Sequence, residues 1–193
     1  MDWTGQQITA AIELCEKLNL YKPVVEQSQY NMFHRERFEG DYAEIFDKYK
    51  YGSTIWSPLA AGLLTGKYLE DMNAGRLNDH MKQFYNWDKW FGPEKTEKTK
   101  EMFKEFGEIA KSLGGTMAQL ALAWVLRNND VSTIICAFSK VDYVDENLKA
   151  VQIAKKFTPE IEERINKLLG NEPERLMDFR TRTPRPSRRE IKN

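Results

Sequence analysis

Helical and strand-like patterns alternate along this chain, and this order constrains its fold more than any other feature. Helices are expected where apolar residues recur at helical spacing, and strands where β-branched and aromatic residues cluster. The expected helices are residues 6–18, 41–50, 94–113, 116–126, 139–151 and 159–169, and the expected strands are residues 23–30, 51–56 and 131–138. Alternation of this kind predicts an α/β fold with a parallel sheet. The third strand is continuously apolar, as a sheet covered on both faces requires.

Three strands are too few for a closed barrel, and both edges of a three-stranded parallel sheet would be bare. We therefore expect the chain to be part of a larger barrel or sheet. About thirty residues, 66–95, separate the second strand from the next helix. This segment is not expected to be a disordered linker, because it contains the aromatic residues Tyr85, Trp87, Trp90 and Phe91. Long loops in compact domains are usually lids or binding loops.

Charge and cysteine content exclude several classes of function. The formal net charge is zero, so no overall field attracts nucleic acid or an anionic membrane. No apolar run is long enough to span a bilayer, and residues 1–3 do not begin a signal peptide. Cys15 and Cys136 lie far apart without metal-ligand spacing and read as reduced thiols. We therefore expect a cytoplasmic protein that binds no nucleic acid and does not insert into a membrane.

Residues 54–68 carry the strongest local signal for a ligand site. The second strand should stop at Pro58, because proline lacks an N–H and has a fixed φ. Small residues, two glycines and Lys67 follow. Small residues allow close approach of the backbone, and a lysine beside free N–H groups suits a phosphate. An ordinary exit from a strand into a loop explains the pattern about equally well. The polar residues 26–29, at the end of the first strand, point to the same edge of the sheet.

Three segments of this sequence resemble the aldo-keto reductase family, and within it the branch of the voltage-gated potassium channel β-subunits. They are P-V-V-E-Q-S-Q-Y-N-M-F (residues 23–33), W-S-P-L-A-A-G-L-L-T-G-K-Y (56–68) and A-Q-L-A-L-A-W-V-L-R-N (118–128). The resemblance implies a partial TIM (β/α)8 barrel, comprising about strands six to eight with their helices. Residues 1–170 would form this C-terminal part of the barrel. Residues 171–193 are a basic tail rich in Pro and Arg that we expect to be mobile and solvated, with a basic binding arm as the alternative.

The resemblance also implies that NADP(H) binds across the carboxyl ends of the strands. The residues at positions that match the family's nicotinamide and pyrophosphate contacts are Gln27, Trp56, Ser57, Pro58, Leu59, Ala60 and Gly62. Gln27 matches the contact to the nicotinamide carboxamide, and Trp56 lies near the nicotinamide end. Lys67 resembles the basic residue that faces the phosphates, to which it would bring a point charge.

The adenosine end of the cofactor is implied by residues farther along the chain. Arg76 resembles a basic residue over the adenosine, and Glu146 with Asn147 resembles the pair that holds the adenine. Ser139 resembles the contact to the 2′-phosphate, and we expect it to open a helix, whose N-terminus favours a phosphate. Two departures weaken this part of the match. Ala137 stands where the family often has glycine, and Tyr143 stands near a usual Gln or Arg.

The family's catalytic tyrosine, lysine, aspartate and histidine come from N-terminal strands that this sequence does not match. The histidines of this chain, His34 and His80, occupy no catalytic position of the family, so we name no catalytic residue and no metal site. The first hypothesis is an NADPH-binding half of an oxidoreductase, inactive alone, that reduces a small carbonyl substrate only when the N-terminal half completes it. The alternative is a non-catalytic interaction subunit that docks with a complementary chain or into a larger assembly, such as a potassium channel.

Overall fold

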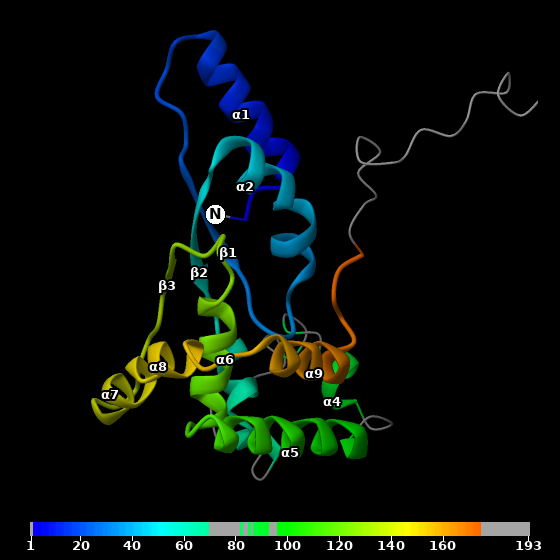
Figure 1. Ribbon diagram of the computed structural model, residues 1–193. Coiled ribbons are helices and arrows are strands. Elements are labelled where there is room, and N and C mark those ends of the chain that lie inside the picture. Colours follow the sequence, from blue (N-terminus) through cyan, green and yellow to red (C-terminus); the bar gives the residue numbers. More distant parts are fainter. Residues whose placement is uncertain (1, 70–81, 83–84, 86, 93–95, 175–193) are drawn as a thin grey trace, which may run out of the picture.

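The computed structural model describes residues 2–69, 82, 85, 87–92 and 96–174 of the 193-residue chain (Figure 1). The strands are β1 (Val25–Gln29), β2 (Gly52–Trp56) and β3 (Thr133–Ile134). The helices are α1 (Gly5–Lys17), α2 (Ala43–Tyr49), α4 (Trp87–Phe91), α5 (Thr96–Ser112), α6 (Met117–Leu126), α7 (Asp142–Leu148), α8 (Ala150–Ala154) and α9 (Pro159–Leu169). A π-helix, η1 (Glu36–Asp41), and the 3-10 helices η2 (Ala60–Thr65) and η3 (Lys67–Leu69) complete the description.

The described strands form one parallel sheet in the order β1-β2-β3. Gln27 pairs with Thr54, and Thr54 pairs with Thr133, so these three residues form one row across one face. Ser28 and Ile55 lie on the opposite face, where both are fully buried. Isoleucines of α1 and α2 belong to the same hydrophobic core as Ile55. The predicted α/β class with a parallel sheet is therefore confirmed, and the arrangement is that of part of a (β/α)8 barrel.

Helix α6 lies beyond the carboxyl end of β2, between the sheet with α1 and α2 and the group of helices that contains α5 and α8 (Figure 1). It contacts η2, α5, α7 and α8, and every residue from Gln119 to Val125 is buried. Its N-terminus is closed by a capping box in which Thr116 and Gln119 satisfy each other's backbone N–H. The apolar residues on all sides of this helix fit its burial.

The third strand differs from its prediction. Residues 131–138 were expected to form a long buried strand, but only Thr133 and Ile134 are in β3. Ile135 is 45% exposed and Phe138 is 38% exposed. The reason is that β3 pairs with β2 on one side, while its other edge has no strand partner in the part of the chain described. An apolar strand is buried only where other elements cover both of its faces, and Ile135 and Phe138 lack such cover.

The helix expected from Ser139 to Val151 is also different. Two helices, α7 and α8, occupy this region, and α7 begins only at Asp142 with Val141 at its N-cap. The first turn is tight, because Val144 N–H donates to Val141 O at 2.8 Å, three residues earlier. Ser139 is therefore outside the helix, and the prediction that it opens one is wrong.

The aromatic residues of segment 66–95 that the structure describes are packed. Trp90 is 8% exposed and stacks on Phe33, with ring centroids 4.4 Å apart. Trp87 stacks on Phe91, also at 4.4 Å. These contacts confirm, for the described aromatics, that this segment is not a plain linker.

Candidate functional site

The chain after β2 contains an unusual run of left-handed backbone conformations. Positive φ angles occur at Ser57 (55°), Ala60 (48°), Ala61 (55°), Gly62 (91°) and Gly66 (79°). Ser57, Ala60 and Ala61 are half of the six non-glycine residues with positive φ in the described part of the chain. Such conformations cost about 1–3 kcal/mol each and concentrate at binding sites. We call residues 57–66 the belt. It begins directly after β2, next to Pro58, where the sequence predicted that this strand would end.

Lys67 lies against the middle of the belt. A Cβ at Gly62 would come within 2.9 Å of Lys67 Nζ, so the end of this lysine side chain lies directly against the glycine. Thr65 Oγ1 donates to Gly62 O at 2.7 Å and tightens the turn below it. Lys67 is exposed, and no carboxylate of the described residues lies within ion-pair distance of its ammonium. A cation at a backbone without a Cβ is an arrangement that fits a phosphate.

Two amide side chains lie on the open face of the sheet beside the belt. Gln27 is half-buried on β1, two residues before Gln29, which pairs with Trp56. Register therefore places both glutamines and Trp56 on one face at the carboxyl ends of β1 and β2. Gln29 is 6% exposed, yet its Nε2 has no hydrogen-bond partner among the described residues. A buried amide without a partner is costly, so this edge of the sheet suits a polar group from outside the described structure.

The first turn of α6 connects the belt to α7. Gln119 Nε2 donates to Glu146 O at 2.7 Å, and Thr116 Oγ1 donates to Glu146 Oε1 at 3.4 Å. On the other side of this turn, the side chain of Met117 occupies the space that a Cβ at Gly66 would need. The elements that carry Lys67 and Glu146 therefore meet at the start of α6.

The remaining candidate residues have different surroundings. Pro58 and Ala60 are buried and Leu59 is half-buried, so these three serve the packing of the belt. Asn147 Nδ2 donates to Tyr143 O at 2.7 Å, whereas its Oδ1 has no partner among the described residues.

The structure does not bring every candidate into this arrangement. Ser139 is exposed outside α7, so the helix-dipole argument for a phosphate does not apply to it. Arg76 and His80 lie outside the described residues. His34 is half-buried beside the end of β1, which is consistent with a packing residue.

The structure adds two residues that the sequence did not single out. Asn31 and Tyr85 both form hydrogen bonds with Ser57, the first residue of the belt. Asn31 had been part of a matching segment without a role of its own, and Tyr85 only one aromatic residue of a loop. The partners lie 26 and 28 residues apart along the chain, so no local pattern could have revealed them.

Titratable groups in the described part of the chain do not cluster as metal ligands do. No group of three or more His, Cys, Asp or Glu there could hold a metal ion. Burial raises the pKa of Tyr85 and of Cys136, which keeps both groups protonated at neutral pH. In the same described part, no single helix combines the length and apolarity that crossing a bilayer requires.

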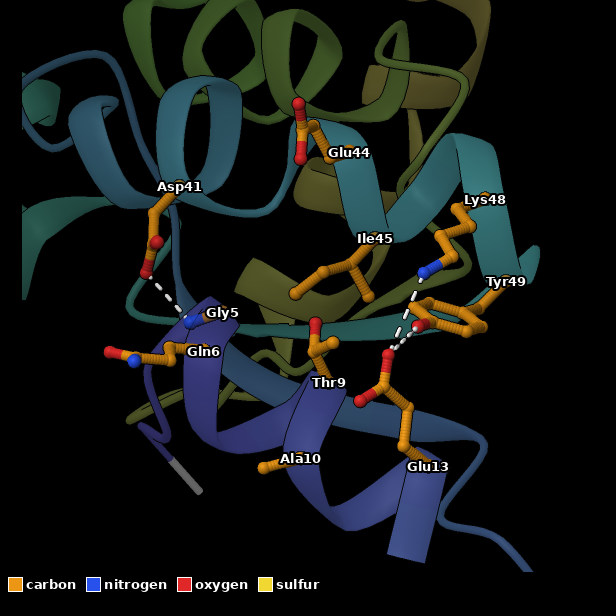
Figure 2. A pocket seen from close by; sticks show the side chains of 10 residues that line it. All are labelled: Gly5, Gln6, Thr9, Ala10, Glu13, Asp41, Glu44, Ile45, Lys48 and Tyr49. Atoms are coloured by element: carbon orange, nitrogen blue, oxygen red, sulfur yellow. Dashed lines mark hydrogen bonds and ion pairs between the residues drawn. The ribbon is translucent and has the colours of Figure 1, made fainter. Parts of the chain in front are cut away.

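A groove that the sequence did not suggest lies between α1 and α2 and has a volume of about 380 Å³ (Figure 2). Several of its polar groups pair with one another. Asp41 Oδ2 accepts from Gly5 N–H at 2.9 Å, and Glu13 Oε1 lies 3.8 Å from Lys48 Nζ. The groove is on the helical side of the sheet, whereas the belt follows the carboxyl end of β2, so the two are separate features.

Comparisons with known proteins agree with this geometry. The Aldo/keto reductase family matches residues 5–169. A probable voltage-gated potassium channel subunit beta of Oryza sativa subsp. japonica is 34% identical over 180 residues, which are 93% of this chain and 54% of that protein. The corresponding putative subunit of Schizosaccharomyces pombe is 38% identical over 176 residues, or 89% and 49%. The probable subunit of Arabidopsis thaliana is 34% identical over 180 residues, or 93% and 54%. The chain thus spans about half the length of these curated relatives.

Proposed function

Because this chain belongs to the aldo/keto reductase family, we propose that it is the NADP(H)-binding part of an oxidoreductase of that family. The observation that carries the proposal is the position of Lys67 against Gly62, in the chain that follows the carboxyl end of β2. Ligands of parallel α/β sheets bind at this end of the strands. A single cation next to left-handed backbone turns suits a pyrophosphate better than it suits an apolar ligand.

The proposal gives each part of the cofactor its residues. Gln27 binds the nicotinamide carboxamide and Trp56 lies beside the nicotinamide ring. The belt from Ser57 to Gly62 and Lys67 bind the pyrophosphate. Glu146 and Asn147 hold the adenine. Arg76 and Ser139 remain proposals from the family resemblance alone.

Bound NADPH would supply a hydride to an aldehyde or ketone. Carbonyl reduction also needs a positioned proton donor, and no residue of the described part is assigned that role. We therefore propose cofactor binding for this chain, and reduction of a small carbonyl substrate only for a completed barrel. The free thiols Cys15 and Cys136 support a reducing compartment, so we propose a cytoplasmic location.

The proposal is tested by titrating NADPH into the protein and following tryptophan fluorescence and heat in parallel. We expect saturable binding in the micromolar range with quenching of Trp56. The variant Trp56→Phe should lose most of the quenching while the calorimetric signal persists. Absence of heat and quenching at millimolar NADPH would exclude the proposed cofactor.

A second candidate function is supported by exposed apolar residues at both edges of the sheet. Val24 and Val25 are 70% and 47% exposed at the start of β1, and Val141 and Leu148 of the α7 region are 83% and 63% exposed. Apolar residues exposed together mark interaction surfaces. We propose that a complementary chain or a larger assembly covers these edges, and the names of the relatives make a potassium channel one such assembly.

Sedimentation velocity distinguishes this candidate. The exposed edges predict self-association at micromolar concentration, or binding to a polypeptide that carries the remaining strands. A sharp monomeric species with cooperative thermal unfolding would contradict the need for a partner.

A further inference from the structure

Ser57, the first residue of the belt, is held by two side chains from different parts of the chain. Asn31 Nδ2 donates a hydrogen bond to Ser57 O at 2.9 Å. The hydroxyl of Tyr85 is hydrogen-bonded to Ser57 Oγ. Neither Asn31 nor Tyr85 has a role in the cofactor contacts proposed above, so the purpose of these two bonds needs its own explanation.

Asn31 is a rigid donor. Its side chain is fully buried, and its Oδ1 accepts hydrogen bonds from the N–H groups of Phe33 and His34, each at 3.0 Å. These two bonds fix which side of the amide carries the nitrogen, and they aim Nδ2 at Ser57 O. Asn31 lies two residues after the end of β1, so its bond to Ser57 connects the end of this strand with the loop after β2.

Tyr85 reaches Ser57 from the long segment between β2 and α5. It is 8% exposed, and burial raises its pKa, so the hydroxyl stays protonated and able to donate. This hydrogen bond links Tyr85 to the first residue of the belt. A Phe at position 85 would keep the buried ring and remove the hydrogen bond to Ser57.

Ser57 needs such ties because of its backbone conformation. Its φ of 55° is left-handed, a state that costs an L-residue with a Cβ roughly 1–2 kcal/mol. Its carbonyl also accepts from Ala60 N–H at 3.0 Å, which closes the first turn of the belt. Loss of the external bonds would let Ser57 relax to negative φ and redirect every N–H that follows in the belt.

We propose that Asn31 and Tyr85 are positioning residues that hold Ser57 in its left-handed conformation and thereby shape the belt for a pyrophosphate. The inference deepens the proposed function and rests on it for the identity of the ligand. We call the two hydrogen bonds from Asn31 and Tyr85 to Ser57 the clamp. The clamp forms within this chain and does not depend on the identity of the ligand. The proposal predicts that the loss of either side-chain bond lowers the affinity for every ligand that carries a pyrophosphate. The affinity for ligands without a pyrophosphate should not change.

The first test needs no cofactor. Hydrogen–deuterium exchange of the free protein should show amide exchange in residues 58–62 that is roughly three- to tenfold faster in Tyr85→Phe than in wild type. Ser57→Ala should increase exchange by the same factor, because both substitutions remove the same hydrogen bond between Ser57 Oγ and the Tyr85 hydroxyl. The double variant should therefore exchange no faster than either single variant. Tyr49→Phe is the matched control, since its hydroxyl bonds to Glu13 in the groove between α1 and α2.

The second test measures affinity for three probes: NADPH, 2′-phospho-ADP-ribose and 2′-AMP. Tyr85→Phe should weaken the first two by the same factor, roughly three- to tenfold, and leave 2′-AMP unchanged. Unchanged exchange in residues 58–62 of Tyr85→Phe would overturn the clamp, whatever the probes do. Faster exchange in a protein whose wild type binds no NADPH would instead refute the proposed cofactor and leave the clamp standing. A loss that differs between NADPH and 2′-phospho-ADP-ribose would overturn the assignment to the pyrophosphate.

Discussion

Lys67 and Gly62 are in such close contact that a Cβ at Gly62 would lie 2.7 Å from Lys67 Cε and 2.9 Å from Nζ. The φ of 91° requires glycine at this position, and a Cβ there would also displace the end of the Lys67 side chain. The position of Lys67 and the backbone shape of the belt therefore depend on each other, and a substitution at Gly62 changes both.

Gly62→Ala should lower the free energy of unfolding by about 1–3 kcal/mol, because alanine is strained at this φ and must displace Lys67. Urea denaturation measures this change. Gly107→Ala is the matched control, since no atom lies within 4 Å of a Cβ at this position in α5. There the same substitution should raise the free energy of unfolding by about 0.5–1 kcal/mol. Equal effects at the two positions would contradict the account of Gly62.

Lys67→Met should reduce the affinity for NADPH about tenfold at low ionic strength, because it removes a cation next to the proposed phosphates. The variant should also show a weaker dependence of affinity on salt than wild type. Titration calorimetry at two salt concentrations provides both numbers. Lys17→Met, an exposed lysine in the last turn of α1, serves as the control and should change neither. If both variants lose affinity alike, Lys67 has no specific role.

Arg35 and Glu39 form a buried ion pair that ties η1 to α9. Arg35 donates to both oxygens of Glu39, at 2.9 and 2.8 Å, and Arg35 Nη1 donates to Asn166 Oδ1 at 2.9 Å. Arg35→Met leaves the Glu39 carboxylate without its cation in a site where the arginine side chain is 4% exposed. We expect unfolding to become easier by about 3 kcal/mol.

The exposed pair Lys100–Glu97, at 2.8 Å, is the comparison for this prediction. Lys100→Met should change the free energy of unfolding by less than about 1 kcal/mol, because water already solvates both charges. Both values come from chemical denaturation of the same preparation. Similar losses in the two variants would show that burial does not govern the Arg35 pair.

His34 should make stability depend on pH. Burial, with help from the charge of Arg37, lowers the pKa of His34 below its ordinary 6.5. The unfolded chain then binds a proton that the folded chain resists, so this contribution is fully present above pH 6.5 and is lost as the pH falls below that value. His34→Gln should remove this part of the loss, as measured by urea midpoints between about pH 7.5 and about pH 5. If the urea midpoints of wild type and His34→Gln fell in parallel with pH, His34 would not be the source of the pH dependence.

Local signals in the sequence predicted the parts of this fold that local interactions decide. Thr4 and Gln7 have the spacing of a capping box, and Gln7 N–H donates to Thr4 Oγ1 at 3.2 Å. Pro58 correctly marked the end of β2, and Gly170 the end of α9. Each of these outcomes depends on the backbone preferences of a few consecutive residues.

The parts that failed depend on distant neighbours. The apolar run 131–138 fits a strand, yet a strand extends only where another pairs with it. Ser139 is a good N-cap residue, but the tight turn at Val141 begins α7 later. The ties of Ser57 to Asn31 and Tyr85 form only when the chain is folded, and no spacing rule encodes them.

The central claim is that a cofactor site lies at the carboxyl ends of β1 and β2, and backbone amide NMR during NADPH titration tests it most directly. The account predicts saturable shifts of the amides in residues 56–67 and around Gln119 and Glu146, with no shifts along the groove between α1 and α2. Shifts confined to that groove, or none at millimolar NADPH, would contradict it.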